Sequence, residues 1–325
     1  LVGMVTEDLN VAAMIIKRIG LGMVTLFVVS AVVFFAVYLM PGDLAEELLG
    51  QARTPETVAN LRADLGLDRP ATERYAQWLG GVLHGNFGKS LANGRPISEL
   101  VGGRLVNTLL LATMAAVVCI PFSLGLGILA ALYRDRVLDR SINVVALTAI
   151  SLPEFFVAYI LIFFLTVKTG WLPSLATVGP DTPFPERLEK SILPILTLTL
   201  AVSAHVMRLT RAAIVNLLAS PYIEMARIKG VLPWRVVVQH ALPNALAPIV
   251  NVVVLNLAYL IVGVVVVEVV FIYPGLGQLM VDSVSKRDVP VVQATCMIFA
   301  ATYITLNLVA DVLTIACDPR QLHPR

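Results

Sequence analysis

Residues 222–245 read YIEMARIKGVLPWRVVVQHALPNA and lie between two very apolar runs. Charged side chains alternate there with residues that break helices, among them Gly230 and Pro243. Unpaired backbone polar groups are costly in hydrocarbon, so a structured polar segment of this kind belongs in water. We interpret the segment as a site that holds a partner on the aqueous side, and the partner pushes on the membrane part.

The composition indicates a polytopic membrane protein. Of its 325 residues, 58% are hydrophobic and 14% are charged, whereas ordinary soluble domains carry about 25% charged residues. This excludes a soluble enzyme with a large core. The net charge of +2 gives no indication of nucleic-acid binding. The histidines are sparse, and the cysteines are too far apart to predict a metal site: Cys119, Cys296 and Cys317.

Six apolar segments are long enough, or nearly so, to cross a hydrocarbon core of ~30 Å, which takes about 20 helical residues. We expect membrane helices at 19–40, 105–132, 142–167, 192–212, 245–267 and 289–315. The predicted fold class is therefore an all-α polytopic membrane protein. No small-residue cleavage site follows the first run, so we expect no cleavable signal peptide.

The distribution of Lys and Arg over the short loops predicts the orientation. With the N-terminus in the cytoplasm, twelve of these residues lie inside and five lie in the short outside loops. The long segment 41–104 holds seven more, but long segments cross the membrane regardless of charge. We therefore expect the tails 1–18 and 316–325 and the segment 213–244 to be cytoplasmic. Segment 41–104 and loop 268–288 are then periplasmic.

The periplasmic segment 41–104 is predicted to be folded. Thr54 followed by Pro55 is typical of a helix start, and Gly66 is suited to end that helix. A second amphipathic helix is expected from about Pro70. It carries Trp78, which suits a membrane interface.

The run Gly88-Lys89-Ser90 is not a nucleotide site. A phosphate-binding loop requires a glycine five residues before Gly88, where Leu83 stands, and no strand precedes it. If transport is ATP-driven, the ATP chemistry must therefore lie on another chain.

Glu154 follows Pro153 in the middle of the third predicted span. A carboxylate at that depth costs at least ~2.5–3.5 kcal/mol, so it should face a cavity or a partner. It is a candidate translocation-path residue, either as a proton relay or as a contact for a substrate ammonium group. Alternatively, the bend at Pro153 simply tolerates it. Glu268 and Asp311 lie nearer the span ends and are expected at the interface.

Small residues in the second span predict close helix packing. Ser123 and Gly127 are four residues apart, a spacing that lets two helix backbones approach.

The polar segment itself is predicted to form two helices. Pro221 breaks the preceding helix, about two helical turns follow, and Gly230 ends them. Met225 and Ile228 would then form a compact knob on the membrane surface. The alternative is an amphipathic connector whose basic side chains meet anionic lipid.

This segment resembles the EAA loop of ABC-importer permeases, whose pattern is E-A-A-x3-G-x9-I-x-L-P. The positions that agree are Glu224, Ala226, Gly230, Leu242 and Pro243. Two positions depart from the pattern, since Met225 replaces Ala and His240 replaces Ile. The resemblance implies that residues 224–243 couple the membrane part to an ATPase.

Shorter motifs over nearly the whole chain resemble the dipeptide/oligopeptide permease family. They are Pro41-Gly42-Asp43, Leu65-Gly66-Leu67-Asp68, Trp78-Leu79, Gly85-Asn86-Phe87-Gly88, Gly94-Arg95-Pro96-Ile97, Glu268-Val269-Val270-Phe271, Pro274-Gly275-Leu276-Gly277, Arg287-Asp288-Val289-Pro290 and Asp318-Pro319-Arg320. That family usually begins near Met14, so residues 1–13 are an addition that it does not explain.

The resemblance implies a type I ABC-importer permease fold in the bacterial inner membrane. The implied assembly pairs this chain with a second, related permease as a heterodimer. Two cytoplasmic ABC ATPases bind Mg-ATP, so this chain needs no cofactor of its own, and a periplasmic binding protein delivers the solute. The expected solutes are di- or oligopeptides, with an opine, a nickel chelate, glutathione or an oligosaccharide as alternatives.

Two other classes of function fit the sequence less well. A proton-coupled secondary transporter would work through Glu154, but the chain has one mid-span acid and no obvious inverted repeat. A membrane enzyme is less compatible still, because no catalytic set stands at a workable spacing in the spans.

Overall fold

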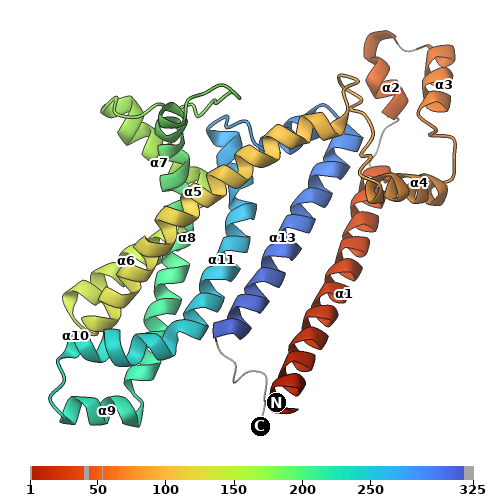
Figure 1. Ribbon diagram of the computed structural model, residues 1–325. Coiled ribbons are helices and arrows are strands. Elements are labelled where there is room, and N and C mark those ends of the chain that lie inside the picture. The colour runs from red at the N-terminus through yellow and green to blue at the C-terminus, as the bar shows by residue number, and fades with distance from the viewer. Residues whose placement is uncertain (1, 40–43, 53, 318–325) are drawn as a thin grey trace. The chain divides into compact units, whose positions relative to one another are not determined.

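The computed structural model describes residues 2–39, 44–52 and 54–317, and their regular structure is helical (Figure 1). Extended pairing among these residues is limited to one bridge between Lys89 and Pro96. A helix satisfies its own backbone polar groups, which suits an apolar chain in lipid. Two motifs of the family resemblance, Pro41-Gly42-Asp43 and Asp318-Pro319-Arg320, lie outside the described residues.

Five helices in the described part of the chain are long and apolar enough to cross a membrane, and a bent pair makes up to a sixth span. This confirms the prediction of an all-α polytopic membrane protein. The five are α1 (Val2–Tyr38), α5 (Ile97–Leu132), α8 (Phe184–Leu218), α11 (Leu242–Val270) and α13 (Val289–Cys317). The bent pair consists of α6 (Val137–Ser151) and α7 (Glu154–Leu161), and α7 continues as the π-helical η2 (Ile162–Lys168).

The third predicted span, 142–167, differs from the expected single helix. The helices before and after Leu152 are bent by 108° to each other. Leu152 is extended, with φ −95° and ψ 131°, and it precedes Pro153. Proline disfavours a helical residue before it, so the helix ends there. Glu154 is consequently the first residue of a new helix.

Short helices occupy the segments between the spans. The segment 41–104 contains α2 (Leu44–Leu49), the 3₁₀ turn η1 (Gly50–Ala52), α3 (Pro55–Asp64) and α4 (Ala71–Leu83). The polar segment contains α9 (Pro221–Ile228), α10 (Pro233–Arg235) and the π-helical η3 (Val236–Ala241). Loop 268–288 contains α12 (Leu276–Ser285), which the sequence analysis did not predict.

The predicted helix start at Thr54 is confirmed. The Thr57 backbone N–H donates to the Thr54 hydroxyl at 3.2 Å, and the Thr54 N–H donates to the Thr57 hydroxyl at 2.8 Å. Two of the orphan donors at the helix start are thereby satisfied. The predicted second helix is also present, since α4 follows Pro70 directly.

The chain divides into two compact units. The first comprises Thr108–Pro274 together with the two end segments of the chain, and the second comprises Gly20–Asn107 and Gly275–Thr302.

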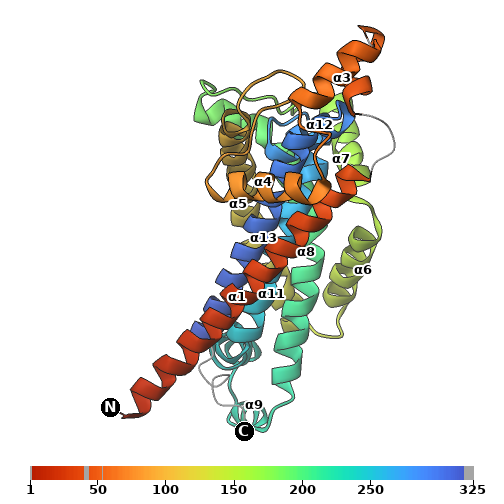
Figure 2. The same ribbon diagram turned by 90° about the vertical axis from the view of Figure 1, so that its right-hand side faces the viewer.

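In the first unit, α8 is the central helix. It packs against α6, α7 and α11, and it runs beside α11 over much of its length (Figures 1 and 2). It also approaches α5 closely at Gly127. A Cβ atom there would lie 2.8 Å from the Thr210 Cβ and 2.9 Å from the Met207 carbonyl oxygen. The small residue at this position is therefore required by helix packing, as its spacing predicts.

In the second unit, aromatic side chains hold α4 against α1. Tyr75 and Trp78 pack against Phe34, with ring centroids 5.3 and 5.9 Å away. The Tyr75 hydroxyl is also hydrogen-bonded to the buried Ser30 hydroxyl, with 2.7 Å between the oxygens. The amphipathic helix therefore buries its apolar face against α1.

Asp288 holds the loop that carries the Gly-Lys-Ser run. The Ser90 hydroxyl donates a hydrogen bond to its carboxylate, and the Leu91 backbone N–H donates to the same carboxylate at 3.0 Å. Asp288 is itself buried. Ser90 thus serves the loop structure, and two motifs that lie about 200 residues apart in sequence meet here.

The packing at Gly127 predicts opposite effects for two neighbouring substitutions. Gly127→Ala should destabilise the protein by about 1–3 kcal/mol, because the added methyl group overlaps the α8 backbone. Gly125→Ala is the matched control, since a Cβ there meets nothing within 4 Å. It should be neutral or slightly stabilising, because alanine favours a helix by roughly 0.5–1 kcal/mol over glycine. Thermal unfolding of the purified variants measures both effects, and equal stability of the two would contradict the assigned contact.

Candidate functional site

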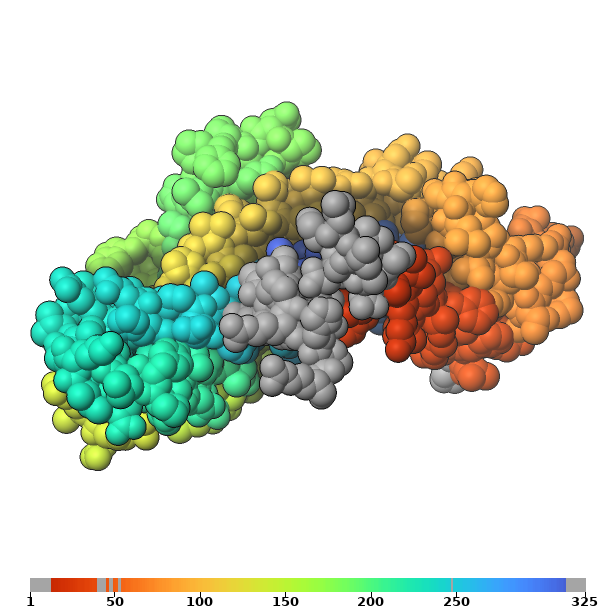
Figure 3. Space-filling model, turned by 60° about the horizontal axis from the view of Figure 1, so that its bottom comes forward, coloured from red at the N-terminus to blue at the C-terminus, as the bar shows by residue number. Residues whose placement is uncertain are grey.

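The polar segment 222–245 forms one exposed surface of the first unit. Helix α9 turns away from the end of α8, and the green-to-cyan atoms of α9 and of the helices after it lie open on one face (Figure 3). Ser220 is extended and Pro221 occupies the first turn of α9, which explains why the chain changes direction there.

The end of α9 requires a glycine. Gly230 has a φ of +77°, a conformation that side chains rarely adopt. Its backbone N–H donates to the Arg227 carbonyl at 2.9 Å, and the Val231 N–H donates to the Ala226 carbonyl at 3.2 Å. This pair of bonds is a Schellman motif, which caps the last carbonyls of the helix.

Ile223 anchors α9 to the membrane helices. Its side chain is 0% exposed and belongs to a buried apolar cluster. The cluster joins residues of α5, α8, η3 and α11, namely Ala131, Ile214, Leu218, Val236, Val237, Ala241, Ala245 and Ile249. Close-packed apolar side chains transmit displacement. Helix α9 is therefore packed directly against the ends of α8 and α11.

The opposite face of α9 exposes large apolar side chains. Met225 is 54% exposed and Ile228 is 72% exposed, and Tyr222 lies three residues before Met225 on the same face. These exposed side chains are the ones expected to form the knob. Glu224 is also exposed, and it makes no hydrogen bond or ion pair with the described residues. The knob therefore offers apolar surface beside a carboxylate with no partner in the described chain.

The Leu-Pro pair marks the return from the polar segment into α11. Pro243 lies in the first turn of α11, where its missing N–H is tolerated. The π-helical turn η3 lies directly before it, and such turns accommodate a local change in helix register. Leu242 packs against the cluster around Ile223.

A buried ion pair holds α8 to α6 close to α9. The Arg211 guanidinium donates to the Asp139 carboxylate at 2.7 and 2.6 Å, and the carboxylate also accepts from the Asn143 amide at 2.7 Å. Asp139 is 3% exposed. Such a paired, hydrogen-bonded carboxylate fixes the geometry of the two helices. Arg211 counts toward the predicted orientation, Asp139 does not, and no signal in the sequence indicates that the two residues pair.

Glu154 lies against α11 at Gly263. A Cβ atom on Gly263 would lie 3.0 Å from both Glu154 carboxylate oxygens, so the glycine leaves room for the carboxylate. Glu154 is half-buried and makes no hydrogen bond or ion pair with the described residues. This isolated acid is not adjacent to α9. The structure therefore does not bring Glu154 together with the EAA-type residues in one site.

Glu268, which is expected near a span end, lies in the last turn of α11 and belongs to a buried polar cluster. Its side chain is 0% exposed and accepts a hydrogen bond from the Thr108 hydroxyl at 2.6 Å. Burial raises the pKa of the neighbouring Tyr273 hydroxyl. Arg187, which bonds to that hydroxyl, opposes the shift, and the Glu268 charge adds to it. Asp311, by contrast, is paired with Arg18 at 3.1 Å.

The apolar helix framework and the anchored, exposed helix α9 define a membrane-embedded transport subunit of the permease class. The chain belongs to the family described as binding-protein-dependent transport system inner membrane component. Residues 123–323 match that family, and residues 11–112 match its N-terminal counterpart. The protein is therefore an ABC-importer permease, a multi-pass protein of the inner membrane.

Individual relatives agree with this assignment. The glutathione transport system permease protein GsiC of Escherichia coli (strain K12) is 40% identical over 306 residues, which cover 94% of this chain and 97% of the relative. Its counterpart in Salmonella paratyphi A is also 40% identical over the same length. The fold resembles the MetNI methionine ABC transporter in an inward-facing conformation, with a TM-score of 0.53 at 18% identity, covering 67% of this chain and 96% of that chain.

The Asp139–Arg211 pair predicts a selective loss of stability. Asp139→Asn should destabilise the protein by about 3–5 kcal/mol, because it leaves the Arg211 charge half-buried without a partner. The matched control is Asp135→Asn, since the Asp135 side chain is 79% exposed and Asn tolerates its positive φ of 64°. Thermal unfolding in detergent measures both variants. A melting temperature for Asp139→Asn equal to that of the control would refute the stabilising role.

Proposed function

We propose that this chain is the translocation subunit of an importer for peptide-class solutes, coupled to ATP hydrolysis through α9. The observation that carries the proposal is the two-sided character of α9. One face exposes Met225 and Ile228, and the other buries Ile223 among the ends of the membrane helices. When a partner bound to the exposed face moves, such a helix moves with it and displaces α8 and α11.

The partners follow from the same arrangement. An ATPase with an apolar groove would receive the exposed face of α9, and Glu224 would meet a donor at the edge of that groove. In this assembly two cytoplasmic ATPases bind Mg-ATP, and a second, related permease completes the pathway. A periplasmic binding protein delivers the solute. The N- and C-termini and α9 are then cytoplasmic, as the distribution of basic residues favours.

The solute class rests on the relatives. The GsiC permeases are described as glutathione transport proteins, and glutathione is a small peptide. We infer that the solute here is also a small peptide, either glutathione itself or a di- or oligopeptide.

Glu154 is proposed to contribute to the translocation path. An unpaired carboxylate in a span is expensive and is expected to face a cavity or a ligand. Its position at the break between α6 and α7, against Gly263, leaves it without a partner in the described chain. The ammonium group of a passing peptide is the chemistry that would match it.

Substitution of Gly230 tests the coupling role. Gly230→Val should reduce ATP-driven uptake by at least about tenfold, because a β-branched residue in the left-handed region costs about 1–3 kcal/mol and displaces the end of α9. Gly230→Asn is the control, since Asn tolerates this conformation and should retain most of the uptake. Uptake of a labelled dipeptide and of glutathione is measured in proteoliposomes with the ATPases and the binding protein. Normal transport by Gly230→Val would sink the coupling assignment.

Substitution of Ile228 tests the docking surface. Ile228→Asp places a charge on the exposed apolar face and should greatly reduce co-purification of the ATPases. Val137→Asp is the control, because Val137 is also exposed and lies at the first position of α6, where an acid is tolerated. Affinity purification of the tagged chain followed by ATPase assays measures both variants. Equal ATPase recovery with the two would place the interface elsewhere.

A further inference from the structure

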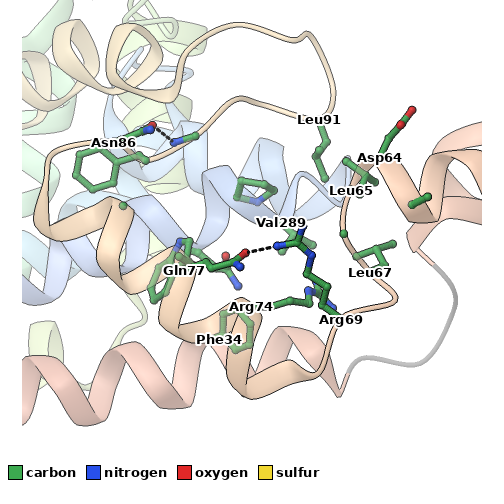
Figure 4. Close-up of a pocket in the computed structure, with 18 residues that line it drawn as sticks. Phe34, Asp64, Leu65, Leu67, Arg69, Arg74, Gln77, Asn86, Leu91 and Val289 are labelled. Carbon is green, nitrogen blue, oxygen red and sulfur yellow. Dashed lines mark hydrogen bonds between the residues drawn. The ribbon is translucent and has the colours of Figure 1, made fainter.

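The second unit contains a pocket of about 490 Å³ that the coupling site does not use. This volume lies within the range of about 300–1,000 Å³ that is typical of small-molecule sites. Its lining comes from α1, α4, the end of α3 with the following turn, the loop after α4 and the start of α13 (Figure 4). The Leu-Gly-Leu-Asp, Gly-Asn-Phe-Gly and Val-Pro motifs of the sequence all contribute to it.

Two polar side chains in the pocket lining have no partner. Gln293 is 5% exposed, and its amide makes no hydrogen bond with the described residues. The Trp78 indole N–H is buried and also makes no hydrogen bond. Buried polar groups of native proteins are normally paired, because an unmade bond costs free energy. The Gln293 amide is therefore available to a ligand, whereas Trp78 contributes its ring to the lining.

The pocket also carries positive charge. The half-buried Arg74 guanidinium contacts the Tyr38 ring at 5.8 Å but forms no ion pair with the described residues. Arg69 lies close to it, but its charge is offset by Glu73 at 3.7 Å, and it donates to Gln77 at 3.1 Å (Figure 4). The opposing charge in the lining is Asp64, whose carboxylate points away from this group (Figure 4). The charge near Arg74 therefore favours an anion.

The apolar part of the lining limits the kind of anion. Phe34 and Trp78 pack together with ring centroids 5.9 Å apart and form one wall. Gln293 can both donate and accept a hydrogen bond, which matches a peptide amide. Arginine binds a carboxylate through two parallel hydrogen bonds. A ligand with a carboxylate, an adjacent amide and a small apolar side chain satisfies every one of these groups.

We propose that this pocket binds the C-terminal end of a short peptide, with the carboxylate on Arg74, the last amide on Gln293 and the last side chain against the Phe34 and Trp78 rings. The inference rests on the proposed peptide solute. It adds a peptide-binding site in the second unit. It is independent of the coupling role of α9, because no residue of the polar segment lines the pocket.

The test measures binding without transport. Tritiated alanyl-alanine is equilibrated with the purified permease complex in detergent, with no ATP and no binding protein present. Saturable binding is expected, and alanyl-alanine amide should bind at least about tenfold more weakly, because it lacks the charge that pairs with arginine. The free peptide should also quench the tryptophan fluorescence that Trp78 contributes, and this quenching should be absent in the Trp78→Phe variant.

Variants assign the binding to the pocket. Arg74→Gln should weaken binding of the free peptide about tenfold, and Gln293→Leu should weaken binding of both the free and the amidated peptide. Arg74→Lys keeps the charge and should retain part of the affinity, which separates ligand loss from misfolding. Arg95→Gln is the matched control, because Arg95 is exposed, does not line the pocket and should leave binding unchanged.

Three outcomes would overturn the proposal. They are the absence of saturable binding, equal binding of the free and amidated peptides, and unchanged binding by Arg74→Gln. The Gly230→Val variant distinguishes the two proposals. It should still bind the peptide in the pocket while it loses ATP-driven uptake, so the binding site and the coupling role are tested independently.

Discussion

Hydrogen bonding of the backbone in a medium without water is the constraint on which this structure depends. Every N–H and C=O within the hydrocarbon must be paired inside the segment that carries it, so each spanning element here is a helix. Helix α5 runs for 36 residues and contains Pro121, and α8 runs for 35 and contains Pro194. Single prolines inside these long helices therefore do not interrupt them.

Helices do end at Pro153 and Pro221, which have polar neighbours in the sequence. The candidate functional residues lie at these two breaks. The break at Pro153 places Glu154 at a helix start beside Gly263. The break at Pro221 turns the chain into α9, and Gly230 turns it back. Helices α9 and α7 are thus short elements attached to long ones, an arrangement suited to movement of one part against a fixed frame.

Some buried or half-buried polar groups in the described residues are paired and others are not, and the unpaired ones also include the Ser191, Thr199 and Thr210 hydroxyls. Asp139 and Glu268 are buried and fully engaged, the first with Arg211 and the second with Thr108, so they hold helices together. Glu154, Gln293 and the Trp78 indole have no partner in the described residues. A low-dielectric interior makes such groups costly. Their persistence is what a solute path or a ligand pocket would explain.

The sequence by itself located five of the membrane helices, because a span needs only length and apolarity, but it did not predict the bend in the third span. It also located α9, since Pro221, Gly230 and Pro243 act on the backbone locally. The close helix packing at Gly127 was also predictable, because Ser123 and Gly127 stand four residues apart on one face of a helix.

Tertiary structure alone decided which distant residues meet. The Asp139–Arg211 pair joins positions 72 residues apart, and the Ser90–Asp288 bond joins positions 198 apart. The pocket at Arg74 and Gln293 likewise combines the start and the end of the chain. No local pattern encodes these meetings, because each depends on how whole helices pack.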